Sequence, residues 1–197
     1  MNIAFFDFDG TITHADSFTP FIYKTIPAQR LKKGKILLIP YILGYKLGIV
    51  SGTTLRSKIF HFGYQGTSAS QLIEYGQKFS EEFLPNILMH HAMQKLEWHL
   101  NRGDKVVLVS ASMDVYLKPW CEKYGLDLIC SEIEAENDVL TGFYKYQDCS
   151  GIVKKLRILK HYNLSDYDEI YAYGDSKDDL PMLSLANKKF YQWKEIE

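Results

Sequence analysis

The chain has 197 residues, 46% of them hydrophobic, which is enough for a sizeable core in one α/β unit with an insertion. Its 23 basic and 24 acidic residues give a net charge of −1, and no nucleic-acid partner is expected. Three widely spaced cysteines form no CxxC pair, which predicts reduced thiols rather than a disulfide framework or zinc site. An apolar segment follows Met1 almost directly, so no signal peptide is expected.

Residues 2–8 are predicted to form a buried parallel strand, because they are almost all apolar. Asp7 and Asp9 come at its carboxyl end, where Gly10 releases the backbone into a loop. Two crowded carboxylates beside a core are costly unless a cation or phosphate chemistry uses them. An acidic turn without a function is the alternative interpretation.

Residues 16–85 look helical throughout, and prolines and glycines divide them into short helices. Between Asp16 and Glu74 the sequence has no acidic residue. The same interval has eight basic residues: Lys24, Arg30, Lys32, Lys33, Lys35, Lys46, Arg56 and Lys58. This charge predicts either a solvated basic surface or attraction of an anionic substrate or an anionic membrane.

The most apolar run of the chain is residues 36–45, and it ends at Lys46. It is shorter than the roughly 20 residues that a membrane-spanning helix requires. We expect a helix that is buried within the helical segment. Attachment to a membrane interface beside the lysines at 32, 33 and 35 is the alternative.

The rest of the chain alternates between strands and helices. Strands are predicted near 104–110, 127–131, 168–174 and 188–192, helices near 113–124, 150–162 and 178–186, and a β-hairpin over 132–146. This alternation predicts an α/β fold with a doubly wound, mostly parallel sheet. Right-handed crossovers then place the strand ends that carry Asp7, Ser110 and Asp175 at one edge of the sheet, where ligands bind in such folds.

Four segments resemble, in chain order, the signatures of the haloacid dehalogenase superfamily, whose members are mostly phosphatases. They are Asp-Phe-Asp-Gly-Thr at 7–11, Val-Val-Leu-Val-Ser-Ala-Ser at 106–112, Cys-Ser-Gly-Ile-Val-Lys at 149–154 and the apolar strand with its acids at 170–182. The third is the weakest, because Lys155 adjoins Lys154 and the helical register decides which one faces the site. Each alone also fits a helix cap, a solvated lysine or an acidic turn.

The resemblance implies a phosphomonoester hydrolase that works through an aspartyl-phosphate. Asp7 would be the nucleophile, and Asp9 would protonate the leaving group and then activate water. Ser110 and Ala111 would bind the phosphoryl group, and Lys154 would compensate its charge.

The resemblance also implies Mg²⁺ as cofactor. Its ligands would be Asp7, Asp175 and the backbone carbonyl of Asp9, which suits the preference of Mg²⁺ for oxygen ligands. Asp179 is expected to lie behind these ligands, and Asp178 to face the substrate.

The helical segment lies where the superfamily has a cap that closes over the pocket. This position predicts a cap at 16–85 and a discontinuous catalytic core at 1–15 and 86–197. The second and third signatures look most like the subfamily of phosphoserine phosphatase, in which Arg56 and Asp16 would contact the substrate.

The substrate stays open, because Gly10-Thr11 stands where phosphoserine phosphatases usually have Ser-Thr. A generic phosphomonoester, phosphoserine and a phospholipid head group of the phosphatidylglycerophosphatase type are the alternatives. A cytoplasmic enzyme without an evident protein partner is expected, and peripheral contact with an anionic inner membrane face is left open.

Three other classes of protein compete with a phosphatase. A phospho-acceptor signalling domain lacks the second acid at Asp9, and a dehalogenase does not need that acid or the metal-binding carboxylates. A catalytically inactive membrane module does not need all four signatures.

Overall fold

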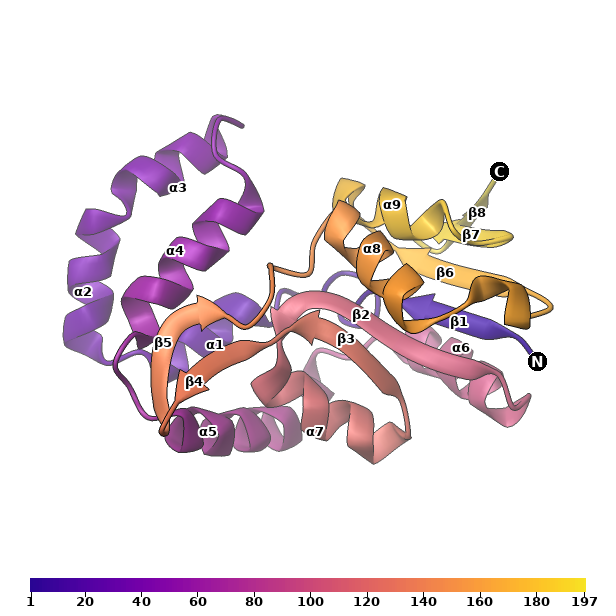
Figure 1. Cartoon of the computed structure of the whole chain (residues 1–197), viewed down its shortest axis with the longest axis horizontal. Helices are drawn as coiled ribbons and strands as arrows, with labels where there is room; N and C mark the ends of the chain where they lie inside the picture. The colour runs from indigo at the N-terminus through magenta and orange to yellow at the C-terminus, as the bar shows by residue number, and fades with distance from the viewer.

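The computed structural model describes residues 1–197 and has a six-stranded sheet at its centre (Figure 1). The strand order is β3-β2-β1-β6-β7-β8, and only β8 runs antiparallel to its neighbour. The strands are β1 (Ile3–Phe6), β2 (Lys105–Met113), β3 (Asp127–Ser131), β6 (Ile170–Gly174), β7 (Lys188–Tyr191) and β8 (Lys194–Ile196). The predicted α/β class with a mostly parallel sheet is confirmed.

Helices cover both faces of the sheet. Because side chains alternate along a strand, Phe6 and Leu108 face one side and Phe5 and Val107 face the other. The first side packs against α6 (His90–Asn101) and α7 (Asp114–Tyr124), and the second against α8 (Ile152–His161) and α9 (Leu180–Leu183). Nearly continuous apolar strands therefore reflect a sheet that is buried on both faces.

Several sequence-based boundaries differ from the structure. The helix predicted near 178–186 is a 3₁₀ turn at Lys177–Asp179 followed by the single turn of α9, where Pro181 lacks a backbone donor. Helix α6 and strand β8 were not predicted. In α6, Ala92, Leu96 and His99 are buried, and Met93 and Leu100 pack against the same core, so the sequence carries a helical apolar period that was overlooked.

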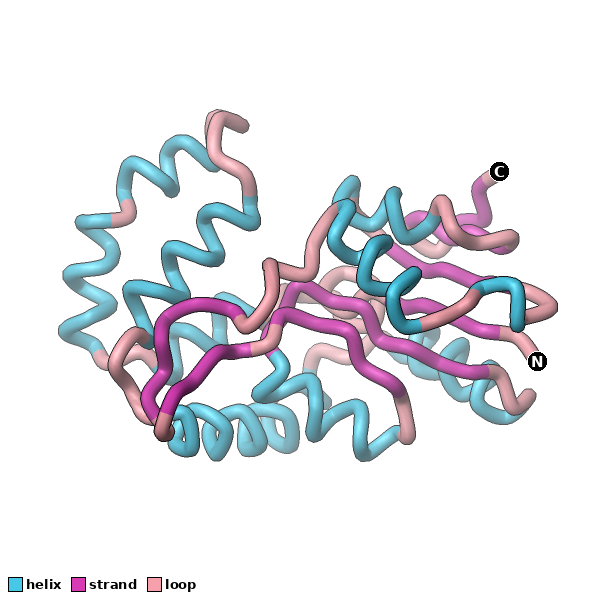
Figure 2. The backbone as a smooth tube through the Cα atoms, viewed as in Figure 1, coloured by secondary structure: helices cyan, strands magenta, loops and turns pink.

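The segment after β1 is helical, as expected, and lies with a hairpin at the carboxyl end of the sheet (Figures 1 and 2). It contains α1 (Phe18–Thr25), α2 (Ala28–Leu37), α3 (Ile39–Lys46), α4 (Gly52–Tyr64), α5 (Ala69–Glu82) and a 3₁₀ turn at Leu84–Asn86. Outside this segment, another 3₁₀ turn spans Leu164–Asp166. The hairpin is β4 (Ile133–Glu136) and β5 (Val139–Tyr144), and it turns at Asn137 and Asp138, which both have positive φ.

The proposed division into a cap at 16–85 and a core stays a prediction, and two packing relations cross it. Helix α5 packs along α7, which belongs to the predicted core. The hairpin strand β5, also from the predicted core, packs against α4. The helical segment is therefore attached to the rest of the molecule at two separate places.

Helix α3 corrects one expectation from the sequence. It has no buried residue, and Ile39, Leu43 and Tyr45 are all exposed. The apolar run at 36–45 is not a buried helix, because α2 and α3 extend away from the sheet and only one side of them meets α4 (Figure 1). No helix of the structure combines the length and the apolar character that crossing a bilayer requires.

The α5–α7 contact generates a stability prediction. Gly76 is buried in α5, and a Cβ atom there would collide with the backbone carbonyl of Val115 in α7. We expect Gly76→Ala to lower the free energy of unfolding by about 1–3 kcal/mol, the usual cost of overpacking. Urea denaturation measures this loss, with Gln77→Ala at the exposed neighbouring position as control. Equal stability of the two variants would contradict the close contact.

Candidate active site

The ends of three adjacent parallel strands bring the predicted catalytic side chains together. Asp7 follows β1, Ser110 lies near the end of β2, and Asp175 follows β6. The backbone N–H of Asp7 still donates to the carbonyl oxygen of Tyr173 (3.0 Å), so the sheet pairing fixes where this carboxylate begins. The site is thus built at one edge of the sheet, as the topology predicts.

A buried ion triad forms the centre of the site. The Lys154 ammonium donates to Asp7 Oδ1 at 2.5 Å and to Asp179 Oδ1 at 2.6 Å. All three residues are almost completely buried. Burial penalises each of these charges, and the opposite charge in contact offsets that penalty.

The register of α8 decides between the two adjacent lysines. Lys154, in the first turn of the helix, points into the site. Lys155 points away and donates to Ser184 Oγ at 3.0 Å. Lys154 is therefore the side chain at the position that the resemblance assigned to it.

Burial and charge together set the protonation of Asp7 and Asp179. Burial raises the pKa of Asp7 to about 7, although Lys154 opposes this effect. Burial also acts to raise the pKa of Asp179. The positive charge of Lys154 and the hydrogen bonds from Lys154 and Ser176 outweigh burial and hold the pKa of that carboxyl below its usual value. Asp179 is thus an anion at neutral pH, whereas Asp7 can gain or lose its proton in that range.

Asp9 has separate partners from Asp7. Its carboxylate accepts from the backbone N–H of Ser17 (2.7 Å) and from Ser112 Oγ (2.5 Å). Burial raises the pKa of Asp9 to about 6, with these two donors acting against the rise. A carboxyl group with this pKa can both hold and release a proton near neutral pH.

Gly10 permits the close approach of two strand ends. It has φ of +86°, and a Cβ atom there would collide with the Asp175 carboxylate. Thr11, which follows Gly10 directly, donates from Oγ1 to Asp175 Oδ1 at 3.4 Å. The Gly-Thr pair after the paired acids therefore serves the packing of the Asp175 side chain.

Three carboxylates could hold a metal ion. Asp7, Asp175 and Asp179 each offer an oxygen within 4.8 Å of the others, and the donor set suits a hard cation such as Mg²⁺. The side chain of Asp9 is not in this cluster, and its backbone carbonyl as a ligand stays a prediction. Asp179 belongs to the same cluster of carboxylates, and its expected place behind the ligands stays a prediction.

Two residues expected to bind substrate have partners within the protein. Arg56, on α4, donates from Nε and Nη2 to the buried carboxylate of Asp148, both at 2.9 Å. Asp16 accepts from the backbone N–H groups of Phe18 (3.2 Å) and Thr19 (2.9 Å) at the start of α1. Contact of either residue with a substrate stays a prediction.

A cavity of about 160 Å³ collects all ten side chains that the sequence singled out. It is lined by Asp7, Asp9, Asp16, Arg56, Ser110, Ala111, Lys154, Asp175, Asp178 and Asp179, together with Phe18, Ser112, Ser150 and Ser176. Asp178 is exposed at its rim. Residues from all four signatures and from two helices before β2 thus meet in one place.

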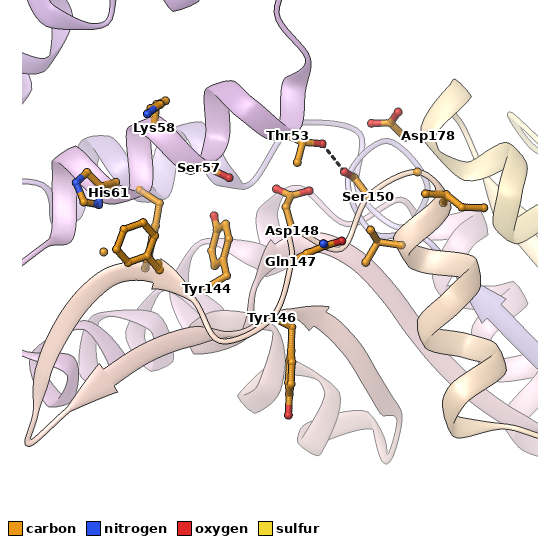
Figure 3. A pocket seen from close by; sticks show the side chains of 16 residues that line it. Thr53, Ser57, Lys58, His61, Tyr144, Tyr146, Gln147, Asp148, Ser150 and Asp178 are labelled. Atoms are coloured by element: carbon orange, nitrogen blue, oxygen red, sulfur yellow. Dashed lines mark hydrogen bonds between the residues drawn. The ribbon is translucent and has the colours of Figure 1, made fainter.

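A larger cavity of about 660 Å³ adjoins the first and shares Ser150 and Asp178 with it. It lies between α4 and the hairpin, and Tyr144, Tyr146 and His61 line it (Figure 3). A hydrogen bond of 2.7 Å between the hydroxyls of Thr53 and Ser150 stands between the two cavities (Figure 3).

Sequence reasoning missed Ser17, Ser112 and Asp148 as partners of functional side chains. Ser112 lies within the second signature, so a hydroxyl two residues after Ser110, pointing the same way along the strand, was a usable signal. Asp148 directly precedes the third signature, but nothing in the sequence links it to Arg56, 92 residues away.

Comparison with known proteins defines the family. The family model for haloacid dehalogenase-like hydrolases matches residues 4–184, and the chain belongs to this family. The prediction of a hydrolase of this superfamily is thereby confirmed.

Three relatives illustrate the similarity. Protein CicA of Caulobacter vibrioides is 29% identical over 189 residues, which cover 95% of this chain and 84% of CicA. The crystal structure of a Bordetella pertussis protein of unknown function has a TM-score of 0.83 at 22% identity, with 96% of this chain and 89% of that chain covered. A phospho-aspartyl intermediate analogue of phosphoserine phosphatase has a TM-score of 0.66 at 18% identity, with coverages of 96% and 85%.

The ion triad generates a prediction that compares adjacent lysines. Lys154→Met leaves Asp7 and Asp179 buried without their shared cation, so we expect the free energy of unfolding to fall by about 3 kcal/mol. Lys155→Met removes only an exposed hydrogen bond and should cost about 0.5 kcal/mol or less. Urea denaturation of both variants checks the difference, and equal losses would show that Lys154 does not hold the triad together.

Proposed function

We propose that the protein is a Mg²⁺-dependent phosphomonoester hydrolase that works through an aspartyl-phosphate on Asp7. The observation that carries this proposal is the pair of carboxylates in different environments: Asp7 accepts from a buried ammonium, and Asp9 accepts from a backbone N–H and a hydroxyl. The environment of Asp7 suits a nucleophile, and that of Asp9 suits a general acid–base group. The similar fold of a phosphoserine phosphatase described as a phospho-aspartyl intermediate analogue supports the same chemistry.

In the first step Asp7 attacks the phosphorus atom, and the bond from phosphorus to the ester oxygen breaks. Asp9 donates its proton to that oxygen, so the leaving group departs as an alcohol and the phosphoryl group stays on Asp7. Lys154 compensates the charge of the phosphoryl oxygens, and Ser110, buried at the end of β2, offers a hydroxyl donor to them. Positioning and neutralisation of charge are the main requirements of phosphoryl transfer.

In the second step Asp9 removes a proton from water, and the resulting hydroxide attacks phosphorus. The bond to the Asp7 oxygen breaks, which releases inorganic phosphate and restores the carboxylate. Asp9 again holds the proton, as it did before the first step. Its raised pKa makes both halves of this cycle accessible near neutral pH.

Asp7 and Asp175 would hold the metal together with the backbone carbonyl of Asp9. Asp179, whose two oxygens already accept from Lys154 and from the Ser176 turn, would stand behind them. When bound, Mg²⁺ supplies positive charge beside the phosphoryl oxygens. Lys154 already lies against two of these carboxylates, so the protein itself provides part of that charge.

The larger cavity would receive the leaving group of the substrate. It adjoins the catalytic cavity, and Tyr144, nine-tenths buried in its wall, has a hydroxyl without a hydrogen-bond partner. A buried hydroxyl without a partner favours a ligand that forms a hydrogen bond with it. The space fits an extended, polar leaving group, such as a phospholipid head group, as well as a small phosphomonoester.

The reaction is tested with a panel of phosphomonoesters, including phosphoserine and lipid phosphates, each with Mg²⁺ and with a chelator. We expect hydrolysis only with the metal. Asp7→Asn should abolish turnover, and Asp9→Asn should lower it by on the order of 10² to 10⁴, the scale of general acid–base catalysis. Asp166→Asn, at an exposed 3₁₀ turn, is the control. Hydrolysis by Asp7→Asn at the wild-type rate would refute the nucleophile.

The leaving-group cavity yields a further prediction. Ser57, on α4, lines only the larger cavity, so Ser57→Phe should fill it and leave the catalytic cavity intact. We expect kcat/KM to fall about tenfold, equivalent to about 1.4 kcal/mol, for 4-methylumbelliferyl phosphate and to change little for acetyl phosphate. Thr54→Phe, exposed on the same helix, controls for added bulk. Equal effects on both substrates would place the leaving group elsewhere.

A further inference from the structure

The region from α2 to the start of α4, residues 28–50, forms an arm with an unusual surface. Large apolar side chains are exposed along its second half: Ile36, Leu37, Ile39, Leu43, Tyr45, Leu47 and Ile49. Ile49, Leu47 and Ile36 are the three most exposed large apolar residues of the whole molecule, at 78%, 73% and 70%. Scattered single residues of this kind are ordinary on a surface, but a cluster is typical of an interaction site.

Helical spacing places part of this cluster on one side. Ile39, Leu43 and Leu47 follow one another at four-residue intervals through α3 and its end, and residues at this spacing are neighbours on a helix. Lys32 and Lys33 stand one turn before Ile36 and Leu37 in α2. Exposed apolar and basic side chains therefore alternate along the same arm.

The protein itself covers only the other side of the arm. Leu38 and Ile42 face Ile59 and Phe62 of α4 around a small apolar cavity of about 90 Å³. Gly34 approaches the Phe62 ring so closely that a Cβ atom would lie 2.9 Å from it. The side of the arm that faces α4 is thus already occupied by its own apolar residues, so the exposed apolar residues cannot turn toward α4 without displacing Leu38 and Ile42.

The charge of the arm identifies its partner. Lys32, Lys33, Lys35 and Lys46 are exposed, and no acidic residue occurs between Asp16 and Glu74. Arg56 is the only basic residue of that interval that forms an ion pair. An apolar strip between unpaired lysines complements an anionic lipid surface, because the strip enters the interface while the lysines reach the head groups.

A second copy of the chain fits this surface less well. In a two-fold contact the same patch meets itself, so the lysines of both arms would be brought together without a carboxylate between them. An acidic bilayer has no such conflict. The charge thus separates two partners that apolar area alone would not distinguish.

We propose that the α2–α3 arm docks reversibly on an anionic lipid bilayer, with the loop at Leu47–Ile49 entering the interface. This inference goes beyond hydrolysis and does not depend on it. The same loop leads directly into α4, whose Thr53 and Arg56 border the two cavities. Docking therefore holds the mouth of the site close to the lipid head groups.

Sedimentation with lipid vesicles tests the electrostatic part. The full chain should bind phosphatidylcholine vesicles that contain phosphatidylglycerol, more weakly in high salt, and should not bind phosphatidylcholine alone. Lys32→Glu/Lys33→Glu/Lys35→Glu should lower the partition coefficient at least about tenfold, because each basic residue near an anionic surface contributes to attraction. A control of equal net charge should bind like the wild type: Lys118→Glu/Lys123→Glu/Lys160→Glu.

A second pair of variants tests the apolar part. Leu47→Ser/Ile49→Ser should reduce binding in both low and high salt, whereas Leu156→Ser/Leu159→Ser, exposed on α8, should not. Neither pair belongs to the catalytic machinery, so circular dichroism and urea denaturation should match the wild type and show that the proteins are folded.

Three results would overturn the proposal. They are absence of binding at low salt, equal loss in the arm variants and their controls, and a concentration-dependent dimer in analytical ultracentrifugation that Leu47→Ser/Ile49→Ser dissociates. The last result would assign the arm to a second copy of the chain. Because none of these measurements requires turnover, their failure is distinguishable from failure of the proposed phosphatase reaction.

Discussion

One buried cation organises the catalytic end of the molecule. Lys154 lies between Asp7 at the end of β1 and Asp179 in the turn after β6, so it joins three segments that are far apart in the sequence. Without it, two carboxylates would share a dry space and would repel each other. The parallel sheet brings these segments to one edge, and the ammonium makes their close approach stable.

The residues around the triad are fixed by equally specific packing. Ser176 Oγ and the backbone N–H groups of Ser176 and Asp175 donate to Asp179 Oδ2 at 2.8, 3.0 and 3.3 Å, so the carboxylate of Asp179 is fully occupied. Gly10 leaves the space that Asp175 fills. The carboxylate of Asp179 is therefore held firmly within the site, whereas Lys177 and Asp178 on the same turn are exposed.

Much of the fold and of the candidate site could be predicted because local patterns report on them directly. Apolar runs that end in polar residues marked β1, β2 and β6, and all ten singled-out side chains line one cavity. Partners distant in sequence could not be found this way. The ion pair of Arg56 with Asp148 depends on how α4 packs over the loop before α8, and the hydrogen bond from Ser112 to Asp9 depends on the pairing of β1 with β2, so neither partner is found within its own segment.

The wrong expectation for residues 36–45 has a different physical origin. Apolar composition predicts that a segment leaves water, but it does not say what covers it. In the arm, Leu38 and Ile42 are covered by α4, whereas Ile36 and Leu43 are not. A helix with apolar residues on more than one side has no single direction of burial, so periodicity alone could not locate the uncovered side.

The two contacts from α4 to the loop before α8 link access to the site with its charge. Thr53 bonds to Ser150 and Arg56 to Asp148, and Ser150 precedes Lys154 by a single helical turn. Any displacement of α4 would have to break these two contacts or move the segment that carries the ammonium. The wall of the larger cavity and the cationic centre therefore share one support, so a substitution that loosens α4 also loosens the segment that carries the ammonium.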